Sequence, residues 1–288
     1  MFELCVDSVF SAQVGISMGV SSLELCSSLI LGGLTPSLGL VAAVARRIQR
    51  FQDSHFADDD APLESQKVGR PLLRVLVRPR AGDFVYTDDE IEVMLNDIRL
   101  LKGFLVHGIV VGCLDASGNV DIGNTQRLVL CAREVGIREV TFHRAIDQAN
   151  DLLAAVEVCH CQLHIDRILS SGGQASAVQG VDMLGKMATL TRAYSMSLVA
   201  AAGINESCAQ LVLQTSGCNG LHGSCTSSSS TSSSLAPTAQ SSNVTAQQQY
   251  QKKVLMGPAD APPRLPNTNS LAELVKICNM YTPNITTS

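Results

Sequence analysis

The sequence predicts a single (β/α)8 barrel of the TIM type, with two surface insertions, over its 288 residues. Three observations favour this fold. Short apolar runs alternate with longer helical stretches from one end of the chain to the other. This unit occurs eight times, as in a TIM barrel. No Gly-x-Gly-x-x-Gly pattern follows the first apolar run, which disfavours the alternative fold, an open doubly wound sheet.

Turn and capping residues set the element bounds in the first half of the chain. Ser8 caps the helix that follows the first strand, and Ser37 caps the next helix after a turn rich in Gly and Pro. The segment Thr87–Glu90 has the spacing of a capping box, which marks the start of the third helix. We therefore expect strands at 2–6, 22–25, 72–77 and 108–111, and helices at 8–18, 37–50, 87–101 and 123–135.

The same alternation continues through the second half. Apolar runs bounded by polar or glycine residues predict the last four strands, and each is followed by a stretch long enough for a helix. We expect strands at 139–142, 167–170, 197–201 and 220–222, and helices at 151–159, 181–194, 206–215 and 271–280.

Two segments interrupt the alternation within one domain that spans residues 1–288. Residues 52–69 carry three consecutive aspartates and a proline, which indicates an acidic surface insertion. Residues 224–249 are almost entirely Ser, Thr, Ala and Gln, a low-complexity composition with no apolar face to bury. We expect both insertions to lie at the surface.

The composition excludes several classes of protein. With 45% hydrophobic and 16% charged residues, the chain can bury a large core and is not a disordered protein. The formal net charge of −5 and the lack of clustered Lys and Arg argue against nucleic acid as a partner. No apolar run reaches the roughly 18–20 residues that span a bilayer, so we expect no membrane partner.

The start of the chain predicts a cytoplasmic protein. Glu3 and Asp7 stand where a secretory signal would be apolar, and no basic segment precedes them. Cytoplasmic thiols stay reduced, so the ten cysteines do not predict a disulfide framework. They are metal ligands, reactive thiols or small core residues.

Polar residues gather where the predicted strands end. In a TIM barrel the active site is built from these C-terminal strand ends and the loops that follow them. We expect strand bodies of Val, Leu and Ile, whereas arginines, a histidine and carboxylates collect at the barrel mouth. This contrast predicts a ligand pocket at the mouth.

Two cysteines on neighbouring strands are the candidate metal ligands. The first two strands both read Glu-Leu-Cys, which places Cys5 and Cys26 at matched positions. Neighbouring strands lie about 4.8 Å apart, so two sulfurs that face the mouth can share one ion. Two thiolates form a soft pair that suits Cu(I). The alternative is that both are small buried hydrophobes, and Cys113 is a third cysteine at the mouth.

The segment Arg78–Asp83 is typical of an anion-binding corner. A proline stiffens it, a glycine lets the backbone approach a ligand, and Arg78 and Arg80 can face one pocket. Arginine suits bidentate binding of carboxylate or phosphate. The alternative is a salt bridge at the rim, which would join Arg78 or Arg80 to Asp83 or Glu24.

A histidine at the end of the fifth strand is a candidate for proton transfer, because imidazole titrates near neutral pH. The candidate catalytic residues are His143, Glu24 and Asp83. The candidate substrate-binding residues are Arg78, Arg80, Arg144 and His222. Glycine turns after the sixth and seventh strands could add backbone donors for an anion.

The segment Cys159–Cys161 with His164 has the residue types of a metal site, yet it does not predict one. It lies at the end of the fifth helix, on the face opposite the mouth. Adjacent residues on a helix cannot all converge on one ion.

In order along the chain, these motifs resemble those of the CutC family of copper homeostasis proteins. The matching segments are Glu3–Ser8, Glu24–Ser27, Gly32–Ser37, Arg78–Phe84, Val140–Ala145, Leu169–Gly172 and Leu221–His222. The resemblance implies a TIM barrel in the cytoplasm, with a nuclear pool, that forms homo-oligomers (dimers or tetramers) and associates with copper. In eukaryotic members a copper role is attributed to the cysteines that match Cys5 and Cys26.

Two functions stay open from the sequence. The first is a copper homeostasis protein that binds Cu(I) through Cys5 and Cys26, without turnover. The second is a TIM-barrel enzyme that acts on a small anionic metabolite carrying a phosphate or a carboxylate. The paired cysteines favour the first, whereas the arginines and His143 favour the second, because copper storage needs neither.

Overall fold

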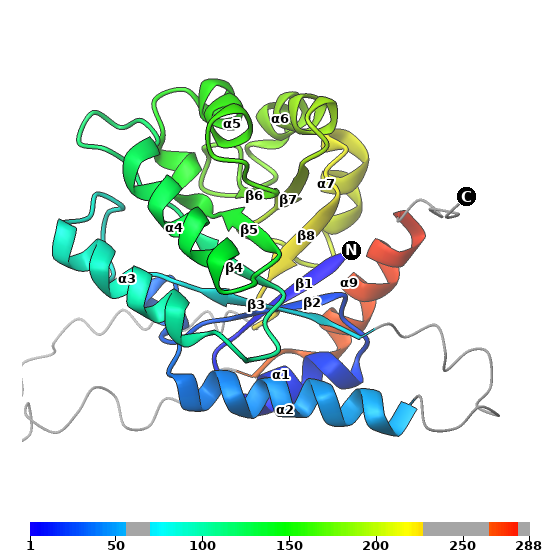
Figure 1. The fold of residues 1–288 in the computed structure, drawn as a ribbon. Coiled ribbons are helices and arrows are strands. Elements are labelled where there is room, and N and C mark those ends of the chain that lie inside the picture. Colours follow the sequence, from blue (N-terminus) through cyan, green and yellow to red (C-terminus); the bar gives the residue numbers. More distant parts are fainter. Residues whose placement is uncertain (56–69, 227–264, 282–288) are drawn as a thin grey trace, which may run out of the picture.

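The predicted (β/α)8 barrel is confirmed by the computed structural model, which describes residues 1–55, 70–226 and 265–281. Eight parallel strands form one closed barrel in chain order (Figure 1). The strands are β1 (Phe2–Val6), β2 (Ser22–Leu25), β3 (Leu72–Leu76), β4 (Gly108–Val111), β5 (Glu139–Phe142), β6 (Arg167–Ser170), β7 (Ser197–Ala200) and β8 (Gly220–Gly223). β1 also pairs with β8, with Glu3 opposite His222, and this pairing closes the barrel.

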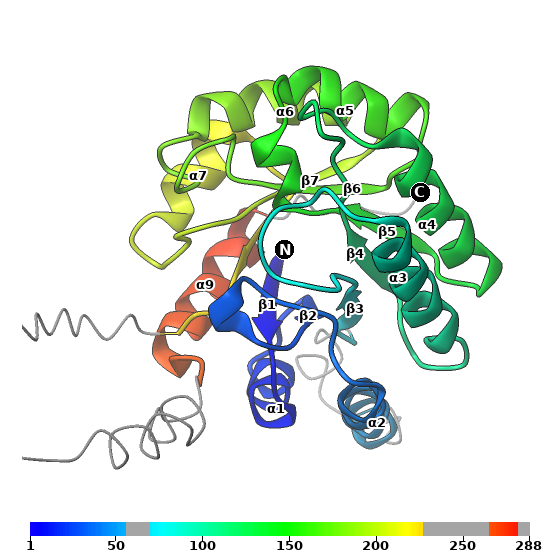
Figure 2. The same ribbon diagram turned by 90° about the vertical axis from the view of Figure 1, so that its left-hand side faces the viewer.

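Helices form a ring around the strands (Figure 2). They are α1 (Val9–Ser17), α2 (Leu38–His55), α3 (Asp88–Leu100), α4 (Ile122–Glu134), α5 (Leu152–Cys161), α6 (Val181–Ala193), α7 (Ala209–Ser216) and α9 (Thr268–Tyr281). The 3₁₀ helices η1 (Leu29–Leu31) and η3 (Arg144–Gln148) follow β2 and β5. α9 packs against α7 and β1 and so completes the ring. None of the described helices has both the length and the apolar character that a membrane span requires.

Some helices begin at other residues than we predicted, because asparagine side chains bind backbone N–H groups in the turn before the helix or in its first turn. α7 begins at Ala209 rather than 206, since Asn205 accepts a hydrogen bond from a backbone N–H two residues on and holds a turn there. α9 begins at Thr268 rather than 271, since the side chain of Asn267 accepts hydrogen bonds from two backbone N–H groups of its first turn.

The two predicted insertions lie largely outside the described residues. α2 extends to His55, so residues 52–55 continue this helix instead of beginning an insertion. The remainder of the 52–69 segment, and residues 227–249 of the 224–249 segment, are not described. Thr226 and Pro266 form an antiparallel bridge, so the chain leaves and rejoins the described fold at one place.

The barrel interior is not the apolar column that we expected of the strand bodies. Glu3, Arg74 and Arg167 have side chains that are at most 2% exposed. They come from β1, β3 and β6, which are not neighbours, so their mutual contacts place them inside the barrel. The expectation was wrong because strand alternation separates two faces without showing which of them is the interior.

These buried charges neutralise one another. Glu3 accepts hydrogen bonds from Arg74 Nη1 at 3.0 Å and from Arg167 Nη2 at 2.7 Å. Arg74 also donates to Glu139, from Nη2 to Oε2 at 2.9 Å. Burial alone would raise the pKa of Glu3, but Arg167, a hydrogen bond from His222 and Arg74 hold that pKa well below its usual range. We call Glu3, Arg74, Glu139 and Arg167 the barrel floor.

Candidate functional site

Cys5 and Cys26 lie side by side above the barrel floor. The β1–β2 ladder continues one step beyond β2, where Cys26 N donates to Val6 O at 2.9 Å. The two sulfur atoms are 3.8 Å apart. Both thiols are free and buried, with exposed fractions of 8% and 0%. The hydrogen bond with Cys26, burial and the charges of nearby carboxylates raise the pKa of the Cys5 thiol well above its usual range.

Glu24 and His222 complete a compact group around Cys5. The Cys5 thiol donates to Glu24 Oε1 at 3.7 Å. One ligand atom from each of Cys5, Glu24 and His222 lies within 4.8 Å of the other two. Glu24 Oε2 is buried and has no polar partner among the described residues. Burial raises the pKa of the Glu24 carboxyl. We call Cys5, Cys26, Glu24 and His222 the mouth cluster.

His222 connects the mouth cluster to the barrel floor. Its Nδ1 donates to Glu3 Oε1 at 3.1 Å, across the closure between β1 and β8. Burial would lower the pKa of His222, but the charges of Glu24 and Glu3 raise it above its usual value. With Nδ1 held in this way, Nε2 is the ring nitrogen left for a further partner.

The mouth cluster offers ligand atoms that soft and borderline metal ions prefer. A zinc–thiolate bond is about 2.3 Å long, so two sulfurs on such an ion lie no more than roughly 4.6 Å apart. The 3.8 Å separation of the Cys5 and Cys26 sulfurs meets this limit. Thiolates select Cu(I) and zinc over hard ions. The residues present therefore fit a copper ion.

Arg78 lies in the mouth without an acidic partner among the described residues. Its two Nη atoms donate to the carbonyl oxygens of Leu31, Gly33 and Gly82, at 2.8–3.3 Å. The guanidinium also stands 5.0 Å from the ring centre of Phe84. The Nε atom of Arg78 is buried and has no hydrogen-bond partner among the residues that the structure describes. Arg78 therefore holds the loops after β2 and β3 together and leaves one buried donor unused.

His143 is a buried and neutral side chain. Its Nδ1 accepts a hydrogen bond from Ala145 N at 3.1 Å, and its Nε2 has no partner among the described residues. Burial and the charge of Arg78 lower the pKa of His143 to about 3. Gly112 gives the ring its space, since a Cβ at Gly112 would lie 2.4 Å from His143 Nδ1. At neutral pH His143 is a hydrogen-bond donor through Nε2, and its role in proton transfer stays a prediction.

Arg80 and Asp83 form a salt bridge at the rim. Arg80 Nη2 donates to Asp83 Oδ1 at 2.9 Å, and Arg80 also pairs with Glu90 in the capping box of α3. The side chains of Arg80 and Asp83 are 35% and 66% exposed. No contact in the described residues joins them to the mouth cluster. Arg78 and Arg80 therefore do not face one pocket, because Glu90 and Asp83 hold Arg80 at the outer surface.

The loop after β6 binds a carboxylate of the chain itself. Asp147 accepts hydrogen bonds from Ser170 Oγ, Ser171 N and Gly173 N at 2.6–3.1 Å. Asp147 also pairs with Arg144 at 2.9 Å. Asp147 is thus the anionic partner of both the glycine turn and Arg144, which from the sequence were candidates for binding an anion. No local sequence pattern pairs Asp147 with a loop more than twenty residues away.

A cavity of about 640 Å³ opens beside the mouth cluster. His222 forms part of its wall, together with Arg144, the loops after β7 and β8, and the start of α9. Many TIM barrels bind phosphate at the corresponding loops and helix N-terminus. Here the carboxylate of Glu206 accepts a hydrogen bond from Ser270 at this helix start. A negative charge already stands at that position, which disfavours a phosphate ligand there.

The other cysteines singled out in the sequence lie away from the mouth cluster. Cys113 packs in the main hydrophobic core, and burial raises the pKa of its thiol to about 12. Cys159 is buried whereas Cys161 is exposed, and His160 stacks on Tyr194 at 4.2 Å. The side chains of the Cys159–Cys161 segment thus face different surroundings, as helix geometry predicts.

Comparisons with known proteins identify relatives over most of the chain. Residues 1–227 match the model of the CutC family. A CutC family protein of Photobacterium profundum is 35% identical over 223 residues, which cover 76% of this chain and 79% of that protein. The copper homeostasis protein cutC homolog of Dictyostelium discoideum is 34% identical over 227 residues, which cover 71% of this chain and 74% of that protein.

A solved structure shares the same fold. The copper homeostasis protein CutC described from Streptococcus agalactiae has a TM-score of 0.67 and 21% identity to this chain, and the match covers 78% of this chain and 98% of that one. The family match spans the barrel from β1 to the end of β8, including every member of the mouth cluster. On these matches, the chain belongs to the CutC family of copper homeostasis proteins.

Proposed function

We propose that this chain handles copper by binding one Cu(I) ion between the thiolates of Cys5 and Cys26. The observation that carries the proposal is the 3.8 Å separation of two buried, free sulfurs at the barrel mouth. Two thiolates form a soft ligand pair of the kind that selects Cu(I). The Dictyostelium relative is named for copper homeostasis, which agrees with this choice of ion.

The surroundings of the two thiols hold them in place and keep Cys5 protonated until an ion binds. A thiol must lose its proton to become a ligand; the raised pKa of Cys5 opposes this loss, so the ion itself must displace the proton, which Glu24 Oε1 already accepts in a hydrogen bond. The barrel floor beneath Cys5 is held by ion pairs between fully buried side chains, so the strand that carries this sulfur has a fixed position. The proposed copper binding does not require the protein to catalyse a reaction.

A Cu(I) titration of the whole chain tests this proposal. Under reducing conditions and in competition with a chelator of known affinity, we expect Cys5→Ser and Cys26→Ser each to weaken Cu(I) binding by more than tenfold. Loss of an outer partner alone typically costs about 10–100-fold in metal affinity, and these residues are the ligands themselves. Cys113→Ser is the matched control, since Cys113 is equally buried and lies outside the mouth cluster. Unchanged affinity in the double variant would refute the proposal.

A second candidate function, the binding of a small anionic metabolite, is favoured by one observation. Arg78 Nε and His143 Nε2 are both buried donors without partners among the described residues, and both side chains lie against Phe84. Buried donors in folded proteins almost always have an acceptor. A carboxylate or phosphate oxygen of a ligand would supply one.

Thermal unfolding with added anions tests the second candidate. Inorganic phosphate and small carboxylates at about 100 times their Kd would stabilise a protein that binds them by roughly 2.7 kcal/mol, which appears as a rise in Tm. We expect Arg78→Lys to remove this rise and Arg80→Lys, on the outer surface, to retain it. The candidate fails if no anion raises the Tm of the wild-type chain, or if the Arg78 variant responds as the wild type does.

A further inference from the structure

The mouth cluster contains a second set of ligand atoms besides the sulfur pair. Cys5, Glu24 and His222 offer a sulfur, an oxygen and a nitrogen that lie within 4.8 Å of one another. They come from β1, β2 and β8, which are adjacent in the closed barrel. We propose that these three side chains form a metal site of their own for a borderline divalent ion such as Zn²⁺, sharing Cys5 with the Cu(I) pair.

His222 is oriented as a metal ligand. Ligating histidines almost always donate their other ring N–H to a carboxylate, a carbonyl or water. His222 donates from Nδ1 to Glu3 Oε1 at 3.1 Å, which leaves Nε2 to bind an ion. Glu3 is fixed in turn by Arg74 and Arg167, at 3.0 and 2.7 Å. This carboxylate–histidine arrangement sets the ring orientation before any ion arrives.

Glu24 has a buried oxygen that requires a partner. Oε2 makes no hydrogen bond with the described residues, although a buried carboxylate oxygen without a partner is costly. Its other oxygen accepts the thiol hydrogen bond of Cys5 at 3.7 Å. A cation bound between Glu24 and Cys5 would replace that weak contact and give the carboxylate a counter-charge.

The charge of the set matches a divalent ion. Metal binding releases the protons of its ligands, so with Cys5 and His222 deprotonated by the ion, one thiolate and one carboxylate neutralise one Zn²⁺ and His222 is a neutral ligand. The barrel floor below is already balanced, because Glu3 and Glu139 face Arg74 and Arg167. A neutral site is the least costly one to bury.

The donor types and the access to the site also favour zinc. Catalytic and exchangeable zinc ions commonly have three protein ligands drawn from Cys, His and carboxylate, with one open position. His222 forms part of the wall of the 640 Å³ cavity, so water or a small ligand can take the open position. Cys5 belongs to both sets, so the divalent ion and Cu(I) exclude each other; this last statement rests on the proposed copper function.

A Co²⁺ titration tests the site, because Co²⁺ replaces Zn²⁺ at such sites and its thiolate charge-transfer band reports a bound sulfur. We expect the reduced full-length chain to show this band, and Zn²⁺ to remove it. Glu24→Gln and His222→Asn should weaken Co²⁺ binding by about tenfold or more, whereas Cys26→Ser should retain it. His222→Asn keeps a donor for Glu3 and removes the Nε2 ligand, so it separates ligation from folding. Glu24→Gln conserves shape, and His160→Asn is the control for the loss of a histidine outside the mouth cluster.

The pattern across variants separates this inference from the copper proposal. If Cys26→Ser loses Cu(I) but keeps Co²⁺, the divalent site stands. If the wild-type chain binds Co²⁺ through the three residues but no Cu(I), the divalent site stands and the copper proposal fails. If Cys26→Ser loses both ions, or if folded Glu24→Gln and His222→Asn bind Co²⁺ as tightly as the wild type, the divalent site is overturned. A wild-type chain that shows no charge-transfer band overturns it as well.

Discussion

Replacing Glu3 by alanine is expected to lower the free energy of unfolding by about 3–5 kcal/mol, the usual cost of removing one member of a buried ion pair. Glu3 is the shared partner of Arg74 and Arg167, and all three side chains are almost completely buried. Without its carboxylate, Arg167 keeps a buried charge with no acidic partner, and His222 loses its acceptor. The penalty comes from the charges left behind rather than from the contact itself.

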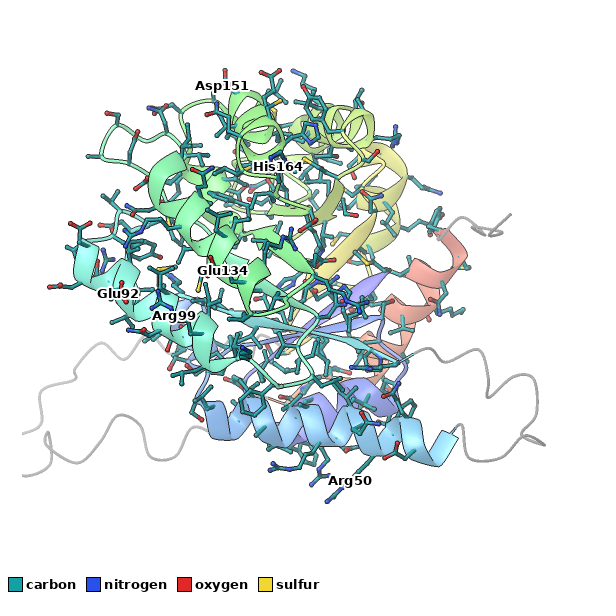
Figure 3. All side chains as sticks on the ribbon, viewed as in Figure 1. Arg50, Glu92, Arg99, Glu134, Asp151 and His164 are labelled. Atoms are coloured by element: carbon teal, nitrogen blue, oxygen red, sulfur yellow. The ribbon has the colours of Figure 1, made fainter. Side chains whose placement is uncertain are left out.

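Urea unfolding followed by far-ultraviolet circular dichroism measures this change, since the chain has no tryptophan to report by fluorescence. Glu92→Ala is the matched control. Glu92 pairs with Arg99 at 3.0 Å, but both side chains are about half exposed on α3 (Figure 3). Exposed pairs contribute little, so we expect almost no change in this control. If Glu3→Ala were no more harmful than Glu92→Ala, the barrel floor would not be a structural element.

Mild acid is expected to weaken the fold through His143. The pKa of this imidazole is about 3 in the folded chain and near 6.5 in the unfolded chain. Between these values the unfolded chain binds the additional proton, so the free energy of unfolding falls as the pH falls. The slope is roughly 1.4 kcal/mol per pH unit for one such group, so the loss between pH 6.5 and pH 5 is about 2 kcal/mol.

The readout is the difference in slope between the wild type and His143→Gln. We expect the variant to have a flatter profile of unfolding free energy from pH 6.5 to pH 5, whatever its absolute stability. Glu3 and Glu139 do not affect this pH range. Their pKa values are lowered in the folded chain, so the stability that they contribute is lost only when the pH falls below about 4.5. His160→Gln, at the Tyr194 stack, serves as the control. Parallel profiles for wild type and His143→Gln would contradict the assignment of a buried neutral ring.

The fold could be predicted from the sequence because the barrel is encoded locally. Each strand is a short and mostly apolar run, and several helices begin at a side-chain cap, as Thr87 and Glu90 show for α3. The interior charges could not be predicted in this way. Arg74 stands in the middle of an apolar strand and Arg167 begins β6, and only the closed barrel shows that both meet Glu3.

The candidate site was predictable to the extent that neighbouring strands build it. Cys5 lies near Cys26 as predicted, but the two are not at matched positions: the β1–β2 register places Cys5 opposite Glu24, and Cys26 follows two residues later on the same face. His222 joins them from the far end of the chain, through the closure of β8 on β1, which no local pattern contains. Arg80 follows the alternative that the sequence left open, a salt bridge to Asp83 at the rim, because its nearest carboxylates decide its orientation.

The barrel floor also decides the route by which an ion can travel. Glu3, Arg74 and Arg167 fill the barrel beneath Cys5 and have at most 2% of their side chains exposed. The barrel therefore cannot act as a conduit with separate entry and exit. Under the proposed copper function, an ion would therefore reach Cys5 and leave it through the same open end of the barrel. Uptake and release of that ion would then compete for one opening and could not take place at the same time.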